Sequence, residues 1–186
     1  MSEIQLDLLL TDLALPIRLY ECRDYSGHSG SFETNLTGIG VRLDDDRGKN
    51  LEDEPYSCSM NVSGERMTAN IYVFKKGKDK TYRKNEGIIF SLNGQTHGSL
   101  PKSIFRRKKV GMSYLADSIL VIVNCSEISF RSRELLFMPS RERLRNCEIK
   151  LKIERELEDI IGNHQGLKKL REKRRREELI YSFVCC

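Results

Sequence analysis

The hydrophobic pattern of the chain is centred on one short apolar run, from Ile119 to Val123. Its five residues are consecutive and mostly β-branched, and the run is too short for a stable helix. A strand of this composition is buried on both faces, because neither set of alternating side chains is polar. The pattern therefore predicts a strand at the centre of a sheet.

Upstream of this strand, apolar and polar residues alternate with a period of two, which is typical of strands with one buried face. The dipeptides Ser63-Gly64 and Asn93-Gly94 favour tight turns, so the strands are predicted to form an antiparallel meander. Residues 4–13 fit both a strand and a helix, and we favour a short helix. The predicted strands cover residues 17–20, 32–43, 58–62, 69–74 and 87–92.

Downstream of the central strand, apolar residues recur at spacings of three and four, which indicates helices. The longest such stripe lies within residues 147–162, and Gly162 and Asn163 are predicted to end its helix. Other helices are predicted at residues 101–109, 128–137 and 167–183. Because strands come first and helices later, the fold class is predicted as α+β, a mainly antiparallel sheet backed by helices. We divide the chain into an α+β domain, residues 1–147, and C-terminal helices with a basic tail, residues 148–186.

Pro139 and Ser140 are interpreted as the start of the long helix. A serine after a proline can cap free backbone N–H groups, and the acidic Glu142 suits the positive end of a helix dipole. Arg141 would then project from a rigid helix N-terminus, where its planar fork can bind a phosphate through two hydrogen bonds. The alternative for each neighbouring arginine is a solvated surface position paired with a nearby glutamate.

The net charge of +5 belongs mostly to the C-terminal tail. The segment from Lys168 to Glu178 holds seven basic and three acidic residues, and Lys168 to Arg176 is the candidate nucleic-acid contact. An aromatic base-stacking surface is not expected, because the chain has no Trp and only 8% aromatic residues.

No metal site and no complete catalytic set is expected. His28, His97 and His164 are far apart and are interpreted as ordinary surface or turn histidines, and the six cysteines form no C-x-x-C pair. The aspartates at 44–46 are interpreted as part of a solvated acidic loop, residues 44–54. No apolar run is long enough to span a membrane and the N-terminus lacks a basic signal-peptide start, so we expect a cytoplasmic protein.

Two short motifs resemble those of one ATPase superfamily. The segment SRERL, which begins at Ser140, resembles the S-R-E-x-L segment in the middle domain of the ninety-kilodalton heat-shock chaperones. The segment IFSLNGQ, which ends at Gln95, resembles the F-V-N-G-R strand and turn of the MutL and MORC ATPases. Residues 15–160 are thus similar, in the order of their motifs, to the second, transducer-type domain of a bacterial GHKL ATPase. The chain departs from the chaperone at Met138 and Arg145, and it lacks a counterpart of the MutL lysine motif.

The resemblance implies a sheet with a left-handed βαβ crossover and a role for Arg141 at the γ-phosphate of ATP. Arg141 would be catalytic, and Ser140, Arg141 and Arg145 would bind the nucleotide, with ATP and magnesium held by a separate GHKL-type domain. That domain would carry an N-x-x-x-E helix and a D-x-G-x-G loop, and the nearest approach to the loop, from Asp46 to Asn50, lacks the final glycine. We therefore expect no ATP hydrolysis by this chain alone, which would be a fragment, an incomplete gene product or a partner in trans.

Two alternatives stay open. One is a non-enzymatic nucleic-acid-binding module that uses the basic segment from Lys168 to Arg176. The other is an assembly module, such as a homodimer, that uses the apolar stripe of residues 149–161.

Overall fold

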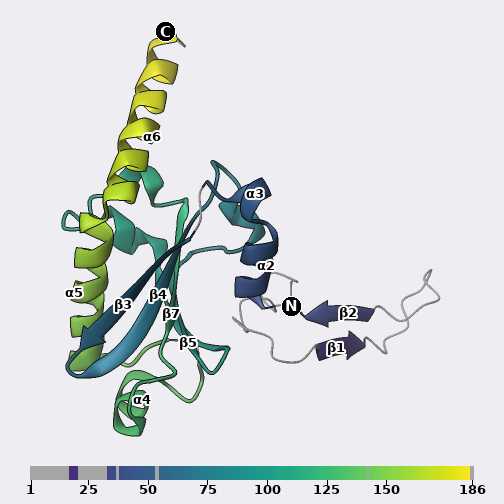
Figure 1. The fold of residues 1–186 in the computed structure, drawn as a ribbon, viewed down its shortest axis with the longest axis vertical. Coiled ribbons are helices and arrows are strands. Elements are labelled where there is room, and N and C mark those ends of the chain that lie inside the picture. The colour runs from purple at the N-terminus through teal and green to yellow at the C-terminus, as the bar shows by residue number, and fades with distance from the viewer. Residues whose placement is uncertain (1–16, 21–32, 37, 53–54, 142, 185–186) are drawn as a thin grey trace.

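The computed structural model describes residues 17–20, 33–36, 38–52, 55–141 and 143–184, and it confirms the α+β class (Figure 1). The strands are β1 (Ile17–Tyr20), β2 (Glu33–Leu36), β3 (Tyr56–Val62), β4 (Glu65–Val73), β5 (Glu86–Leu92), β6 (Gln95–Pro101) and β7 (Ile119–Asn124). The helices are α2 (Ile39–Asp45), α3 (Arg47–Asn50), α4 (Phe130–Leu136), α5 (Glu148–Asn163) and α6 (Gln165–Val184). Three short 3-10 helices join them, η1 (Asp79–Thr81), η2 (Lys102–Arg106) and η3 (Ser113–Leu115).

The main sheet has five strands in the order β3-β4-β7-β5-β6, with β7 at its centre as predicted. All neighbours are antiparallel except β5 and β7, which run parallel and are connected through β6, η2 and η3. The residues from Ile119 to Val123 are at most 7% exposed, because the sheet is covered on both faces at this strand. The handedness of the β5–β7 crossover stays a prediction. Strands β1 and β2 form a separate two-stranded sheet.

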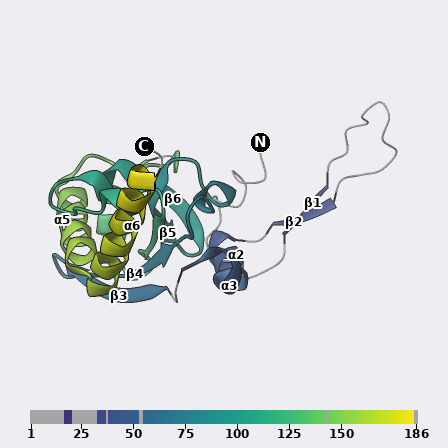
Figure 2. The ribbon, with the colours of Figure 1, turned by 90° about the horizontal axis from the view of Figure 1, so that it is seen from above.

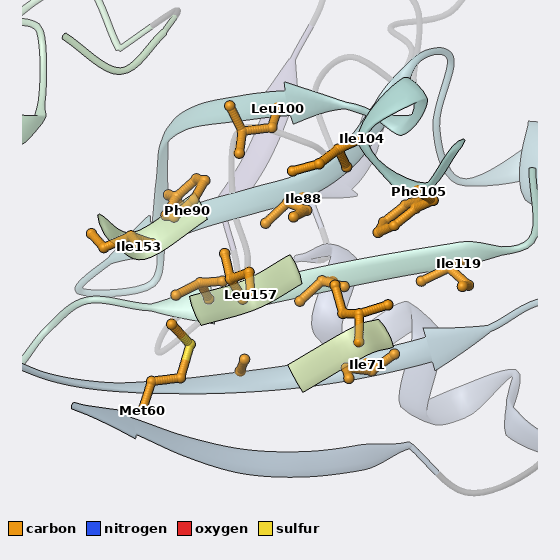
Figure 3. Close-up of a cluster of buried hydrophobic side chains, with 14 of the residues drawn as sticks. Met60, Ile71, Ile88, Phe90, Leu100, Ile104, Phe105, Ile119, Ile153 and Leu157 are labelled. Atoms are coloured by element: carbon orange, nitrogen blue, oxygen red, sulfur yellow. The ribbon is translucent and has the colours of Figure 1, made fainter. Parts of the chain in front are cut away.

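Two hydrophobic clusters lie on opposite faces of the main sheet. The larger cluster joins β3 to β7 with α5, and Ile153 and Leu157 of α5 point at the strand side chains in Figure 3. The smaller cluster places Ile39 and Leu43 of α2 against Tyr72 of β4 and against β5 and β7. Figure 2 shows the result, with α5 and α6 on one side of the sheet and α2 and α3 on the other.

Helix α5 shares its core with the strands. Ile153, Leu157 and Ile161 are at most 1% exposed, and Leu167 at the start of α6 is buried in the same cluster. The division predicted at residue 147 is therefore a change of secondary structure and not a separate core. The apolar stripe of α5 packs inside the protein, so it does not offer the surface that the assembly hypothesis requires.

Several local predictions are corrected by the structure. The segment from Ile39 to Leu43 is helix α2 and not a strand, because its apolar residues also lie four positions apart and pack on one face of the sheet. The acidic loop predicted at residues 44–54 begins as the end of α2 and continues as α3. The basic helix predicted at residues 101–109 is the 3-10 turn η2. Helix α5 runs through Gly162 to Asn163, and its C-cap residue is His164. Residues 4–13 lie outside the described part of the chain.

Candidate anion-binding site

The segment that holds Ser140 and Arg141 is a loop and not the start of a helix. Helix α5 begins only at Glu148, with Cys147 as its N-cap residue, so the predicted capping role of Ser140 is wrong. Pro139 and Ser140 instead occupy the middle of a turn in which the Arg141 backbone N–H donates to the Met138 carbonyl at 3.0 Å. Proline in the first central position of such a turn has the φ that the turn needs.

The described residues of this loop, 137–141 and 143–145, are closed off at both ends by backbone contacts. Phe137 and Leu144 form an antiparallel bridge, and the Arg145 N–H donates to the Leu136 carbonyl at 2.8 Å. Leu144 is 6% exposed and packs over Gly98 of β6, where an added Cβ would lie 3.0 Å from Leu144 Cδ2. The loop turns back because Leu144 must reach this core position, and a helix through Arg141 would carry it away.

Arg141 has a left-handed backbone, with φ of 57°. A non-glycine residue is uncommon in this region, and helices do not contain it. The guanidinium is exposed, and its Nη1 donates to Oε1 of Gln95 on β6 at 2.7 Å. Arg141 is therefore held on a closed loop against a strand that lies far from it in sequence.

A pocket of about 480 Å³ opens beside Arg141, between the β5–β6 hairpin, α4 and the loop. Apolar side chains form much of its wall, and three arginines supply its positive charge. The lining residues are Leu92, His97, Phe130, Arg133, Glu134, Phe137, Met138, Pro139, Arg141 and Arg145. Ser140 lies in the adjacent turn and is exposed, but it does not line this pocket.

The three guanidinium groups of the pocket donate to neutral acceptors. Arg145 Nε donates to the Phe137 carbonyl at 3.0 Å, and Arg133 donates to the carbonyls of Ser126 and Ile128 at 2.6 and 3.0 Å. Within the described part of the chain, no carboxylate forms an ion pair with any of the three, although Glu134 lines the same pocket. Three arginines that line one pocket without a described carboxylate partner attract anions.

His97 was interpreted from the sequence as an ordinary histidine, and the structure places it in this pocket. Its ring meets Phe137 edge-on, with 5.3 Å between the ring centroids. Burial lowers the pKa of His97, and the positive charge of Arg141 lowers it further. The sequence motif IFSLNGQ ends at Gln95, two residues before His97. If residues after the Asn93-Gly94 turn had been predicted as a strand, the two-residue spacing would have placed His97 on the same face as Gln95.

Helix α4, which carries Arg133, is fixed at its N-terminus. Ser129 caps the helix by accepting the Ser132 N–H at 3.3 Å. The Glu65 carboxylate then accepts the Ser129 N–H at 2.7 Å and the hydroxyls of Ser129 and Ser132, both at 2.6 Å. These contacts tie α4 to the start of β4 and so position one wall of the pocket.

The basic tail divides into two sets of residues. Arg174 is 7% exposed and pairs with Glu52, while Arg171 donates to Glu172 and to the Gly111 carbonyl, so both face the body of the protein. Lys169, Lys173 and Arg176 are exposed and line an open groove on the outer face of α6. Figure 1 shows the second half of α6 extending beyond the sheet.

The described residues contain no cluster of three or more His, Cys, Asp or Glu side chains that could hold a metal ion. Cys58, Cys125 and Cys147 are free thiols, and burial raises the pKa of Cys125 to about 12. None of the described helices is both long enough and apolar enough to cross a membrane.

Comparison with protein-family models finds no matching family, and a search of curated proteins finds no match. The resemblance to GHKL transducer domains therefore rests on the two motifs and their order along the chain.

Proposed function

We propose that this chain is the transducer part of a GHKL-like ATPase and that Arg141 reaches the γ-phosphate of ATP bound by a separate domain. One observation carries the proposal. The Arg141 guanidinium is exposed at a pocket with two further arginines, and among the described residues its hydrogen-bond acceptor is the neutral amide of Gln95. Because an amide oxygen is neutral, this contact leaves the positive charge of Arg141 available to an anion.

The two motifs of the resemblance support the proposal by their positions. The Asn93-Gly94 turn leads into β6, and Gln95, the first residue of β6, contacts Arg141 of the second motif. Segments separated by 46 positions thus form one site. The motifs are adjacent in the fold, as expected if they act on one ligand.

The residues present fit a phosphoryl group. When bound, ATP with magnesium would supply the phosphoryl group, whose charge spreads over its oxygens as the bond to the leaving group breaks. Arg141 would donate hydrogen bonds to those oxygens, and Arg145 and Arg133 would add positive potential. Ser140 would contribute through the turn that orients Arg141. The loop is preorganised by its bridge and turn, so little ordering is needed when an anion arrives.

The test is ATP hydrolysis by the complete assembly, in which a GHKL-type ATP-binding domain is joined to this chain in cis or added in trans. We expect Arg141→Ala to lower kcat by about a hundredfold or more, the usual loss for one preorganised transition-state donor. Arg141→Lys should recover only part of the rate, because lysine cannot form the two-pronged contact. Arg143→Ala is the matched control, since Arg143 is an exposed arginine of the same loop outside the pocket. An Arg141→Ala enzyme that retains its rate would refute the role.

A second function, nucleic-acid binding, is favoured by one specific observation. Lys169, Lys173 and Arg176 lie three or four residues apart and so share the outer face of α6. Arg171 and Arg174 would take no part, because both contact the body of the protein. The nucleic-acid contact would therefore involve fewer residues than the whole segment from Lys168 to Arg176.

Duplex DNA binding at several salt concentrations tests this second function. Changing Lys169, Lys173 and Arg176 together to Gln should reduce the slope of log K against log salt by about 2 to 3, near 0.9 for each lost phosphate contact. The same charge change at Lys49, Lys78 and Lys84, three exposed positions away from α6, should leave the slope unchanged. Equal slopes for both triple variants would exclude the outer face of α6 as the contact.

A further inference from the structure

Among the described residues that line the pocket, His97 is the one whose charge can change near neutral pH. It lies on β6 two residues after Gln95, the acceptor of the Arg141 hydrogen bond. Its ring packs edge-on against Phe137, so it is held at the pocket wall beside Arg141. The strand that holds Arg141 therefore also presents an imidazole to the same space.

The charges that face His97 come from every element around the pocket. Arg141 and Arg145 belong to the loop, and Arg133 and Glu134 belong to α4. Partial burial disfavours a protonated imidazole and lowers the pKa of His97, and the positive charge of Arg141 lowers it further. The lowered pKa favours the neutral imidazole in the free protein.

A bound anion would reverse this balance. A doubly charged phosphoryl group beside Arg141 offsets the arginine charges and offers His97 an acceptor, and both effects favour the imidazolium form. We propose that His97 is a proton-dependent ligand of the phosphoryl group at this site, which takes up one proton from solvent and donates it in a hydrogen bond to the anion. This inference rests on the proposed function in one respect, because it takes a phosphoryl group as the ligand of the pocket.

Proton uptake predicts how affinity changes with pH. Between the lower pKa of His97 in the free protein and its higher pKa in the complex, one proton is bound with each anion. The affinity then rises by up to about tenfold for each unit by which the pH falls. A histidine that only packs against Phe137 would give no such slope.

The experiment is a sulfate titration of the full chain at several values between about pH 6 and 8, with binding read from NMR shifts. Sulfate imitates a phosphoryl dianion, and its own charge does not change in this range. His97→Gln keeps a polar side chain and His97→Phe keeps the ring contact with Phe137, but neither can take up a proton. The NMR signal of the Cε1 proton of His97 gives the pKa of His97 with and without sulfate. His164 serves as the internal reference, because it packs against Tyr56 and does not line this pocket.

We expect the wild type to bind sulfate more tightly as pH falls, the His97 pKa to rise on binding, and both variants to give a flat profile. Loss of sulfate binding in Arg141→Gln would confirm that the ion occupies this pocket. A wild-type affinity that changes by less than about twofold over this pH range, or that follows the variants, overturns the role of His97. Failure of the wild type to bind sulfate at all also overturns it. Neither result decides the proposed function, which depends on the effect of Arg141→Ala on ATP hydrolysis.

Discussion

Arg141 Nη1 and Gln95 Oε1 lie 2.7 Å apart and join the loop after α4 to strand β6. The contact fixes the direction of a guanidinium without cancelling its charge, because an amide oxygen is neutral. Among the described residues, Arg141 is held in position without a carboxylate partner, whereas Arg107 bonds two glutamates of α5 at 3.0 and 2.7 Å.

Giving Arg141 a charged partner should weaken anion binding. Gln95→Glu keeps the size of the side chain and adds a carboxylate at the existing acceptor position. We expect about three- to tenfold weaker sulfate binding, with a change in unfolding free energy of no more than about 1 kcal/mol, as for an exposed ion pair. Gln95→Ala is the control, since it removes the contact without adding charge. Sulfate affinity in Gln95→Glu equal to that of the wild type would contradict the electrostatic role of the pocket.

The close contact between β6 and the loop predicts the effect of a single methyl group. In Gly98→Ala, the new Cβ would lie 3.0 Å from Leu144 Cδ2 and 3.2 Å from the Arg143 and Leu144 backbone, so the loop must shift. We expect a loss of about 1–3 kcal/mol in urea unfolding, the usual cost of overpacking. Sulfate binding should weaken as well, because the loop carries Arg141. Gly48→Ala has open space around the new Cβ and should be neutral or slightly stabilising, so equal effects of the two changes would argue against the contact.

The Glu65 carboxylate should make stability depend on acid pH. Hydrogen bonds from the Ser129 and Ser132 hydroxyls and from the Ser129 N–H hold the pKa of Glu65 below its usual value of 4.5. A lowered pKa in the folded protein means that the stabilisation is present above the pKa of the unfolded chain and is lost as pH falls through the folded value. Glu65→Gln should therefore cost on the order of 1 kcal/mol at neutral pH, and the difference from wild type should shrink below about pH 4.

Urea unfolding at both pH values measures this effect. Glu127→Gln changes an exposed glutamate near the start of α4. Its difference from wild type in unfolding free energy should not change between neutral and acid pH. A constant difference between Glu65→Gln and wild type at all pH values would show that the carboxylate charge is not responsible.

The ion pair of Arg174 and Glu52 should anchor α6 to the body of the protein. Arg174 is 7% exposed and also donates to the Phe74 carbonyl, so removing Glu52 leaves a cation largely out of water. We expect Glu52→Gln to lower the unfolding free energy by about 1–3 kcal/mol, more than an exposed pair and less than a fully buried one. Glu178→Gln, at an exposed glutamate of the same helix, should change the unfolding free energy by less than about 0.5 kcal/mol. Equal urea midpoints for Glu52→Gln and Glu178→Gln would show that the Arg174–Glu52 ion pair does not anchor α6.

The sequence predicted the fold correctly where the local pattern of residues was compatible with only one type of secondary structure. The apolar run at Ile119 had no polar face, so it could only be a buried strand, and the turns at Ser63-Gly64 and Asn93-Gly94 have the positive φ that their residues favour. The α5 stripe satisfied the helical period over four turns. Ile39 and Leu43 fitted both periods, and packing against the sheet chose the helix.

Strand β6 and the candidate site were harder to predict. The β6 sequence is polar and contains Gly98, and it forms a strand because β5 supplies its hydrogen-bonding partner. Pro139-Ser140 is a signal shared by helix starts and turns, and the burial of Leu144 against Gly98 selected the turn.

The sequence by itself determined the central strand, the hairpin turns, the helical C-terminal half and the arginine-rich character of the segment after α4, because each depends on residues close together along the chain. Only the tertiary structure decided that Arg141 meets Gln95, that His97 shares its pocket, and that Arg174 faces inward while Lys173 faces solvent. These relationships join residues that are far apart in sequence, and they are set by which side chains must leave water when the sheet and helices pack.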